Sequence, residues 1–173
     1  MRFRVLAVLA VLLALAAAVV SAPGTACACS CVRMGPAEQV EHATAVFTGT
    51  VTAVRRTPGG PLDPEPPVVY VFRADQVYKG ELGAEVEVAS STSSAACGYA
   101  FTVGARYLVL ASDEGGNLAG SDPGVPLTTT LCSGNREVRP GDGPLREDDV
   151  LDDEPLAGGL LAALGTARPP AAA

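Results

Sequence analysis

AVFTGTVTAVR, residues 45–55, is the stretch that decides the fold class. Apolar side chains alternate along it with threonines: Phe47, Val51 and Ala53 against Thr48, Thr50 and Thr52. A period of two is typical of a strand with one buried and one solvent-facing side. Gly49 falls on the apolar side, which indicates a bulge or a close approach of another backbone. The stretch therefore predicts a half-buried strand.

Similar segments follow on the C-terminal side at short intervals. They are residues 68–78, 84–89, 106–112 and 125–132, with residues 97–103 as a further candidate. On the N-terminal side, residues 35–43 form a helical stretch, in which Gly35 suits the N-cap and Pro36 the first turn. Five or six short strands separated by turn signals predict an all-β domain. We expect a closed or nearly closed antiparallel barrel with a short helix near its start.

Residues 1–28 have the layout of a secretory signal peptide. Arg2 and Arg4 precede an unbroken apolar stretch, residues 5–20, and residues 21–28 are small and polar. The sixteen apolar residues fall short of the ~20 that a bilayer-spanning helix needs. The sequence therefore predicts a secreted, extracellular protein with no stable membrane span in the mature chain.

Small residues at Ala26 and Ala28 favour cleavage before Cys29. Three weaker alternatives are a cut after Ala22, retention of the segment as a membrane anchor, and a lipid anchor on Cys27. The mature domain would then run from residue 29 to residue 138.

Cleavage before Cys29 leaves four of the five cysteines: Cys29, Cys31, Cys97 and Cys132. An even number in an exported protein indicates two disulfides. Because a bond between Cys29 and Cys31 would be strained, two pairings stay open: 29–97 with 31–132, or 29–132 with 31–97. A metal cluster on Cys27, Cys29 and Cys31 is the weaker alternative, since the spacing lacks CxxC and a nearby histidine.

Composition excludes several function classes. The 19 acidic and 12 basic residues give a net charge of −7, which argues against a nucleic-acid partner. His42, the one histidine, excludes sites that need two imidazoles and fits an exposed position on the short helix. No arrangement of serine, histidine and acid supports a hydrolase, so we expect neither enzymatic activity nor a cofactor.

Residues 139–173 differ from the rest of the chain. Six of the eight residues in 147–154 are acidic, and an alanine, glycine and proline tract follows. The acidic run lacks the glycine and ligand spacing of a calcium loop, and the mildly apolar residues 155–167 are too short to span a membrane. We expect a disordered tail with at most one helical turn.

Several segments together resemble one family. They are Cys29-Ser30-Cys31-Val32, AVFTGTV (45–51), VYVFRADQVYKG (69–80), SSAACG (93–98), ARYLVLAS (105–112) and LTTTLCSG (127–134). In order and spacing they resemble the inhibitory N-terminal domain of tissue inhibitors of metalloproteinases, a netrin-like module. The resemblance extends from residue 29 to about residue 138.

The resemblance implies an OB-fold barrel and the disulfides Cys29–Cys97 and Cys31–Cys132. It also implies that the α-amino group and carbonyl of Cys29 chelate the catalytic zinc of a target metalloendopeptidase, displacing the attacking water. The implied inhibitory wedge consists of Cys29, Ser30, Cys31, Val32, Ser93, Ser94, Ala95 and Ala96. The only metal in this scheme is that of the protease, and the inhibitor is expected to be a monomer.

The chain departs from the family in three respects, one of which is the proline-rich strand connection at residues 57–67. The positions of a third disulfide are empty, and the acidic tail stands where animal members carry a second, six-cysteine domain. These departures keep two alternatives open: a non-inhibitory binding module, and a disulfide-stapled structural module of the cell envelope.

Overall fold

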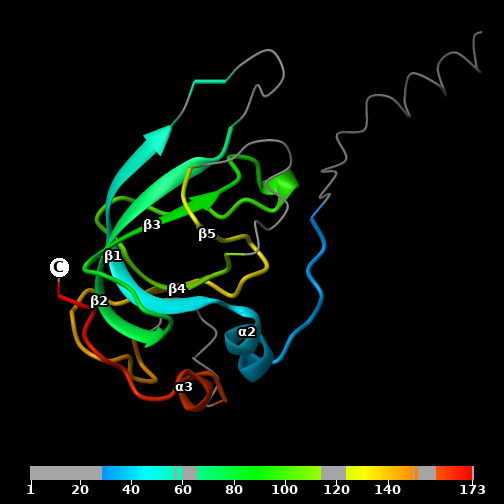
Figure 1. Ribbon diagram of the computed structural model, residues 1–173. Coiled ribbons are helices and arrows are strands. Elements are labelled where there is room, and N and C mark those ends of the chain that lie inside the picture. The colour runs from blue at the N-terminus through cyan, green and yellow to red at the C-terminus, as the bar shows by residue number, and fades with distance from the viewer. Residues whose placement is uncertain are drawn as a thin grey trace, which may run out of the picture.

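The computed structural model describes residues 29–56, 58–59, 66–113, 124–149, 151 and 159–172 (Figure 1). Its elements in chain order are helix α2 (Pro36–His42), strands β1 (Ala45–Arg56), β2 (Val68–Lys79) and β3 (Glu85–Ser90), 3-10 helix η1 (Ser94–Ala96), strands β4 (Arg106–Ala111), β5 (Leu127–Thr128) and β6 (Arg136–Val138), and helix α3 (Gly159–Leu164). The predicted short helix is confirmed, as are the strands matching β1, β2, β3 and β4. The predicted signal peptide, residues 1–28, lies outside the described residues.

Six strands form one mixed sheet in the order β5-β3-β2-β1-β4-β6. Neighbouring strands are antiparallel except β3 and β5, which run parallel. The central strand β1 shifts its register against β2 three times, one of them between Thr48 and Gly49. A Cβ on Gly49 would lie 2.9 Å from the carbonyl oxygen of Arg73, so the predicted close backbone approach is confirmed. Such shifts bend a strand and increase its twist.

The expectation of an antiparallel barrel needs correction, because one strand pair is parallel and the sheet is not closed. The residue after β4 and the strand β5 meet at one isolated bridge, where Ser112 and Thr128 exchange backbone hydrogen bonds of 2.9 and 2.8 Å. The expected strand over 125–132 contracts to β5, because the Ser133 hydroxyl accepts the Thr130 N–H and turns the chain. Residues 97–103 form no strand, since Cys97 is left-handed (φ 60°) at the end of η1.

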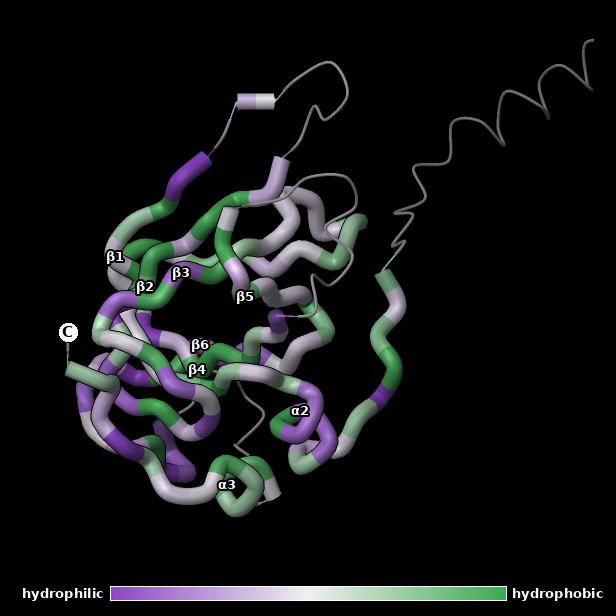
Figure 2. Tube along the Cα trace, in the orientation of Figure 1, coloured by the Kyte–Doolittle hydropathy of each residue, from purple (hydrophilic) through white to green (hydrophobic). Residues whose placement is uncertain are grey.

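The larger hydrophobic cluster is built around aromatic rings. Phe101 follows η1 and packs edge-on against Tyr70, Phe72 and Tyr107 with ring centroids 4.9–5.0 Å apart. A second cluster includes Leu108 from β4 together with residues of α3. Because neighbouring residues of β4 join different clusters, this strand is buried on both faces. Figure 2 shows the hydrophobic residues following the strands of the sheet.

The described part of residues 139–173 packs against the sheet, unlike the expected disordered tail. Leu160 and Leu164, one turn apart on α3, are buried in the second cluster. Arg168 exchanges backbone hydrogen bonds of 2.7 and 3.0 Å with Val77, so the C-terminal segment covers part of the β2 edge. Of the acidic run, residues 147–149 are described and residues 152–154 lie outside the described ranges. Among the described residues, no helix is long and apolar enough to cross a membrane.

A buried ion pair ties the loop after β6 to the sheet. The Arg106 side chain is 4% exposed and donates to both carboxylate oxygens of Asp75, at 3.1 and 2.5 Å. The same guanidinium donates to the carbonyl oxygens of Arg139 and Gly143, at 3.4 and 2.7 Å. A buried guanidinium is destabilising unless its N–H groups have acceptors. The two carbonyl oxygens that accept from Arg106 therefore fix the loop after β6 to the sheet.

Tyr78 makes a second connection to the same region. Its hydroxyl accepts a hydrogen bond of 2.9 Å from the backbone N–H of Leu145. Burial raises the pKa of Tyr78 above its ordinary value, and the Leu145 hydrogen bond opposes that shift only in part. The folded protein therefore favours the neutral, protonated form of the Tyr78 phenol.

Candidate disulfide ridge

Residues 29–32 precede the first helix and are joined to the rest of the domain by two disulfides. Cys29 is bonded to Cys97 and Cys31 to Cys132, with Cα–Cα distances of 5.2 and 5.3 Å. Of the two pairings that the sequence leaves open, this is the one that the family resemblance implies. The bonds span sequence separations of 68 and 101 residues, so Cys29 and Cys31 are fixed to distant parts of the chain.

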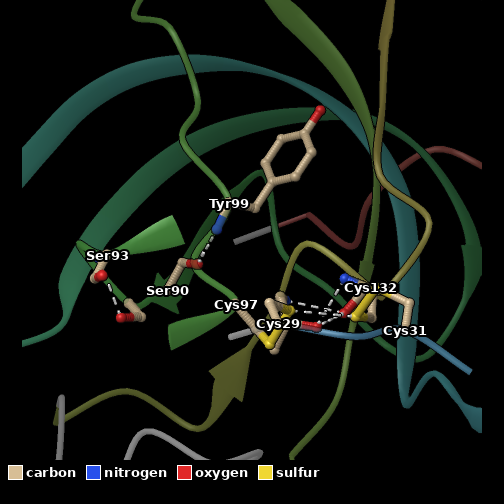
Figure 3. The surroundings of a disulfide bond; sticks show 10 residues. Cys29, Cys31, Ser90, Ser93, Cys97, Tyr99 and Cys132 are labelled. Carbon is tan, nitrogen blue, oxygen red and sulfur yellow. Dashed lines mark hydrogen bonds between the residues drawn. A yellow bond between two sulfur atoms is a disulfide. The ribbon is translucent and has the colours of Figure 1, made fainter. Parts of the chain in front are cut away.

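The two disulfides lie side by side (Figure 3). The sulfur atoms of Cys29 and Cys132 belong to different bonds and are 3.8 Å apart. Between and beyond the bonded positions, the side chains of Ser30 and Val32 face solvent, with Val32 80% exposed. A short exposed segment is thus held by covalent bonds at its first and third residues.

The loop that carries Cys97 supplies a second exposed segment. Ser94, Ala95 and Ala96 form η1 and are exposed, while Ser93 is half-buried. The Ser93 carbonyl oxygen accepts hydrogen bonds from the N–H groups of Ala96 and Gly98, at 3.0 and 2.9 Å. The Cys29–Cys97 bond therefore joins the two segments, 29–32 and 93–96, that carry the residues of the implied wedge. We call residues 29–32 and 93–97 the ridge.

Gly98 explains how the loop closes so tightly. A Cβ at this position would lie 2.1 Å from the carbonyl oxygen of Ser91 and 2.9 Å from that of Ser93. Next to it, the Tyr99 N–H donates to the Ser90 hydroxyl at 2.9 Å (Figure 3). Only a residue without a side chain permits this approach.

A turn behind the ridge holds Cys132 and is the part of the site that sequence reasoning missed. The Leu131 N–H donates to the carbonyl oxygen of Cys97 at 2.7 Å, joining this turn to the ridge. The Leu131 side chain is 47% exposed and adds apolar surface beside the disulfides. Nothing in LTTTLCSG distinguished Leu131 from a strand residue, because its exposure depends on a turn made by serine and threonine hydroxyls.

Sequence analysis also missed Asn135, whose buried side chain stabilises that turn by hydrogen bonds. Its side-chain oxygen accepts the Leu110 N–H at 3.0 Å, and its amide nitrogen donates to the Thr130 carbonyl oxygen at 3.2 Å. The residue is 3% exposed. This buried amide fixes the turn to β4, and through the turn it fixes Cys132.

A shallow pocket of about 260 Å³ adjoins the ridge between α2, the end of β4 and the turn. Cys132, Ser133 and Thr130 line one side, and Met34 and His42 of the helical region line the other. His42 is exposed, as expected for a surface position. The described residues that line this pocket include the hydroxyl residues Ser112, Thr130 and Ser133 beside His42 but no carboxylate.

The sulfur atoms are the only metal-ligating group that clusters in the described part of the chain. Those of Cys29, Cys31 and Cys132 lie within 4.8 Å of one another. All three are oxidised in disulfides, and metal binding requires the thiolate, so they offer no ligands in this state.

The chain was compared with known proteins. No family model matches it, and no curated protein sequence matches it. Its function is therefore inferred from the ridge itself.

Proposed function

We propose that the protein is a secreted inhibitor of zinc metalloendopeptidases that acts through the N-terminus of Cys29. The observation that carries the proposal is segment 29–32, exposed from Ser30 to Val32, which is held at Cys29 and Cys31 by disulfides and joined to the loop whose residues 94–96 are exposed. A segment held in one conformation loses little entropy when it enters a protease cleft.

The zinc-binding groups in this proposal are the α-amine and carbonyl oxygen of Cys29. A catalytic zinc keeps one coordination position for water or substrate, and a neutral amine is a suitable ligand for it. Occupation of that position displaces the water that attacks the substrate. Ser30 then enters the adjacent specificity pocket, and Cys31 and Val32 follow the cleft as a substrate would.

The proposal requires that residues 1–28 be removed by a signal peptidase, so that Cys29 carries a free amine. The two disulfides favour an oxidising compartment, where such bonds persist. The mature protein would act as an extracellular monomer without enzymatic activity.

The fold assignment that accompanies this function is an OB-fold of the netrin-like type. Three observations support it: the strand order β5-β3-β2-β1-β4, the parallel β3–β5 pair, and the bridge between Ser112 and Thr128 that joins the end of β4 to β5. OB-folds are partly open five-stranded Greek-key barrels, which accommodates a sheet joined by one short bridge.

The decisive experiment compares three forms of the chain on a panel of zinc metalloendopeptidases. The forms begin at Cys29, at Cys29 with an acetylated amine, and at one added alanine before Cys29. Only the first should inhibit. We expect the other two to weaken inhibition by about a hundredfold or more, since even indirect changes at metal sites cost about 10–100-fold.

Thermal unfolding of all three forms provides the control, because the changes are confined to the α-amine of Cys29 and leave its disulfide in place. Equal inhibition by the acetylated form would overturn the mechanism. If the free-amine form inhibits no protease of the panel but still binds a cell-envelope partner, the non-inhibitory binding module takes its place.

A pH titration gives an independent test of the ligand. The α-amine has an ordinary pKa of about 7.7 and binds zinc only when neutral. Inhibition should therefore weaken by about tenfold per pH unit below that value. Activity of the uninhibited protease at each pH is the control, and an inhibition constant that stays level down to acidic pH would contradict the amine ligand.

A further inference from the structure

We propose that the four ridge and turn cysteines form a zinc site when both disulfides are reduced. The ligands are the thiolates of Cys29, Cys31, Cys97 and Cys132. This site belongs to the protein itself and is separate from the protease zinc of the proposed inhibition. The starting observation is that three of the sulfur atoms lie within 4.8 Å of one another, and the fourth, that of Cys97, is bonded to one of them.

Three of the sulfur atoms have a spacing close to that of a tetrahedral zinc–thiolate centre, whereas the Cys97 sulfur lies outside this group and must move closer when the disulfides open. With zinc–sulfur bonds of about 2.3 Å, the edges of the tetrahedron are about 3.8 Å. The sulfur atoms of Cys29 and Cys132 already have this separation, at 3.8 Å. After reduction, each formerly bonded pair must separate by only about 2 Å, which side-chain rotation allows.

Two of the four ligands keep their positions without the disulfides. The Leu131 N–H bonds to the Cys97 carbonyl oxygen at 2.7 Å, so the two backbones that carry Cys97 and Cys132 remain together. The Cys132 N–H donates to the Thr130 hydroxyl at 3.2 Å, and Asn135 holds the Thr130 carbonyl oxygen. The fold therefore positions two of the four ligands, Cys97 and Cys132, before the metal binds.

The other two ligands arrive on one short segment. Cys29 and Cys31 are separated by Ser30 alone, and both sulfur atoms already face Cys132 at short range. Cys31 is exposed and the other three cysteines are half-buried, so a reductant and a metal ion both have access.

The chemistry balances with a dithiol as the reductant. Each disulfide takes up two electrons and two protons, and one dithiol is oxidised to its cyclic disulfide for each bond that opens. Zn²⁺ then displaces the four thiol protons, because thiolates are the ligands it binds. The same four residues thus link the N-terminal segment to the domain in both redox states, first by covalent and then by coordinate bonds.

The test uses the full purified protein and no protease, so its failure leaves the proposed inhibition untouched. The protein is reduced with a phosphine, which leaves no competing thiol, and titrated anaerobically with Co²⁺ and then Zn²⁺. We expect one Co²⁺ per chain with the intense visible absorption of tetrahedral thiolate cobalt, and its loss when zinc replaces it. The unreduced protein should show neither.

Variants identify the ligands. Cys97→Ser and Cys132→Ser should each weaken cobalt binding at least about tenfold, the lower end of the effect of disturbing a metal site. Ser30→Ala is the matched control, since Ser30 lies between two ligands and contributes none. Binding that is as tight in Cys97→Ser as in the parent protein would overturn the four-cysteine site.

A second measurement covers the case in which reduction unfolds the chain. Circular dichroism and the exchange rate of the Leu131 amide are recorded on the reduced protein with and without zinc. We expect zinc to restore the native spectrum and to slow that exchange at least about tenfold, since metal binding is coupled to folding. Zinc uptake that restores neither would mean binding by an unfolded chain and would overturn the proposal.

Discussion

At the scale of single residues, the ridge depends on one position without a side chain. Gly98 lies where a Cβ would be 2.1 Å from the Ser91 carbonyl oxygen. Neither that backbone oxygen nor that of Ser93 belongs to a flexible side-chain end, so the loop itself would have to move.

We predict that Gly98→Ala lowers the free energy of unfolding by about 3 kcal/mol, the upper end of the usual cost of overpacking. Urea unfolding measures this loss. Gly143→Ala is the matched control, because no atom lies within 4 Å of its Cβ position, and it should stay within about 1 kcal/mol of the parent protein. A Gly98→Ala variant of parental stability would mean that the loop relaxes freely.

Tyr78 should make stability depend on alkaline pH. Its pKa is raised in the folded protein by burial. A raised pKa means that its contribution is fully present below the unfolded value of about 10 and is lost as pH rises through the folded value. Chemical unfolding between neutral pH and pH values above about 10 should therefore show a steeper loss for the parent than for Tyr78→Phe.

The Tyr78→Phe variant has a cost of its own at neutral pH. It leaves the Leu145 N–H without its acceptor, and we expect about 1 kcal/mol of destabilisation there. The prediction concerns the pH slope, which this constant offset does not change. Parallel curves for the two proteins would refute it.

At the scale of elements, α3 is where the structure departs furthest from expectation. Its sequence, Gly-Leu-Leu-Ala-Ala-Leu, favours a helix but has only six residues, and a helix this short is not stable on its own. Leu160 and Leu164 form one apolar pair, and the cluster that buries them includes Ala43 at the end of α2 as well as Leu108 of β4. Since that cluster could not be known from residues 155–167, sequence analysis assigned them to a disordered tail.

We predict that Leu164→Ala costs about 2–5 kcal/mol of unfolding free energy, as for other buried leucines. Differential scanning calorimetry measures the effect. Leu151→Ala is the control, since Leu151 is 53% exposed and its loss should change stability by about 0.5 kcal/mol at most. Equal effects of the two substitutions would show that the packing of Leu164 in α3 does not contribute to the stability of the domain.

The six strands show which sequence signals are enough to predict a strand and which are not. β1 and β3 were predictable because apolar and polar residues alternate in them, β2 because it is dense in β-branched and aromatic residues, and β4 because it is a short run of apolar residues. β6 has three residues and β5 two, too few for any period. The parallel pairing of β5 follows from contacts with β3 and not from its own residues, so an antiparallel barrel was expected in its place.

The candidate site was predictable to a similar degree. The cysteine count gave two disulfides but left two pairings, and the family resemblance selected one of them. Leu131 and Asn135 carried no signal, because their roles come from hydrogen bonds to Cys97 and Leu110, which are far from them along the chain.

At the scale of the whole molecule, the two disulfides should contribute nearly equally to stability. They close loops of sequence separation 68 and 101, and the entropy of loop closure grows only with the logarithm of length. Each bond has a nominal value of about 4 kcal/mol.

We predict that the double variants Cys29→Ser/Cys97→Ser and Cys31→Ser/Cys132→Ser lose stability to within about 1 kcal/mol of each other. Thermal unfolding without reductant compares them. Reduction of the parent protein in the absence of metal should cost more than either variant. A large difference between the two variants would show that local packing around one bond, and not loop closure, determines its contribution.

The pairing of Val77 with Arg168 has a consequence for how the chain is made. The backbone groups of Val77 in β2 lack these hydrogen-bond partners until residues 168–171 leave the ribosome. In the same way, Cys31 cannot form its disulfide until Cys132 has been synthesised. Contacts this far apart in sequence form slowly, and they form late. The domain consequently cannot complete its fold until Cys132 and residues 168–171 have both been synthesised.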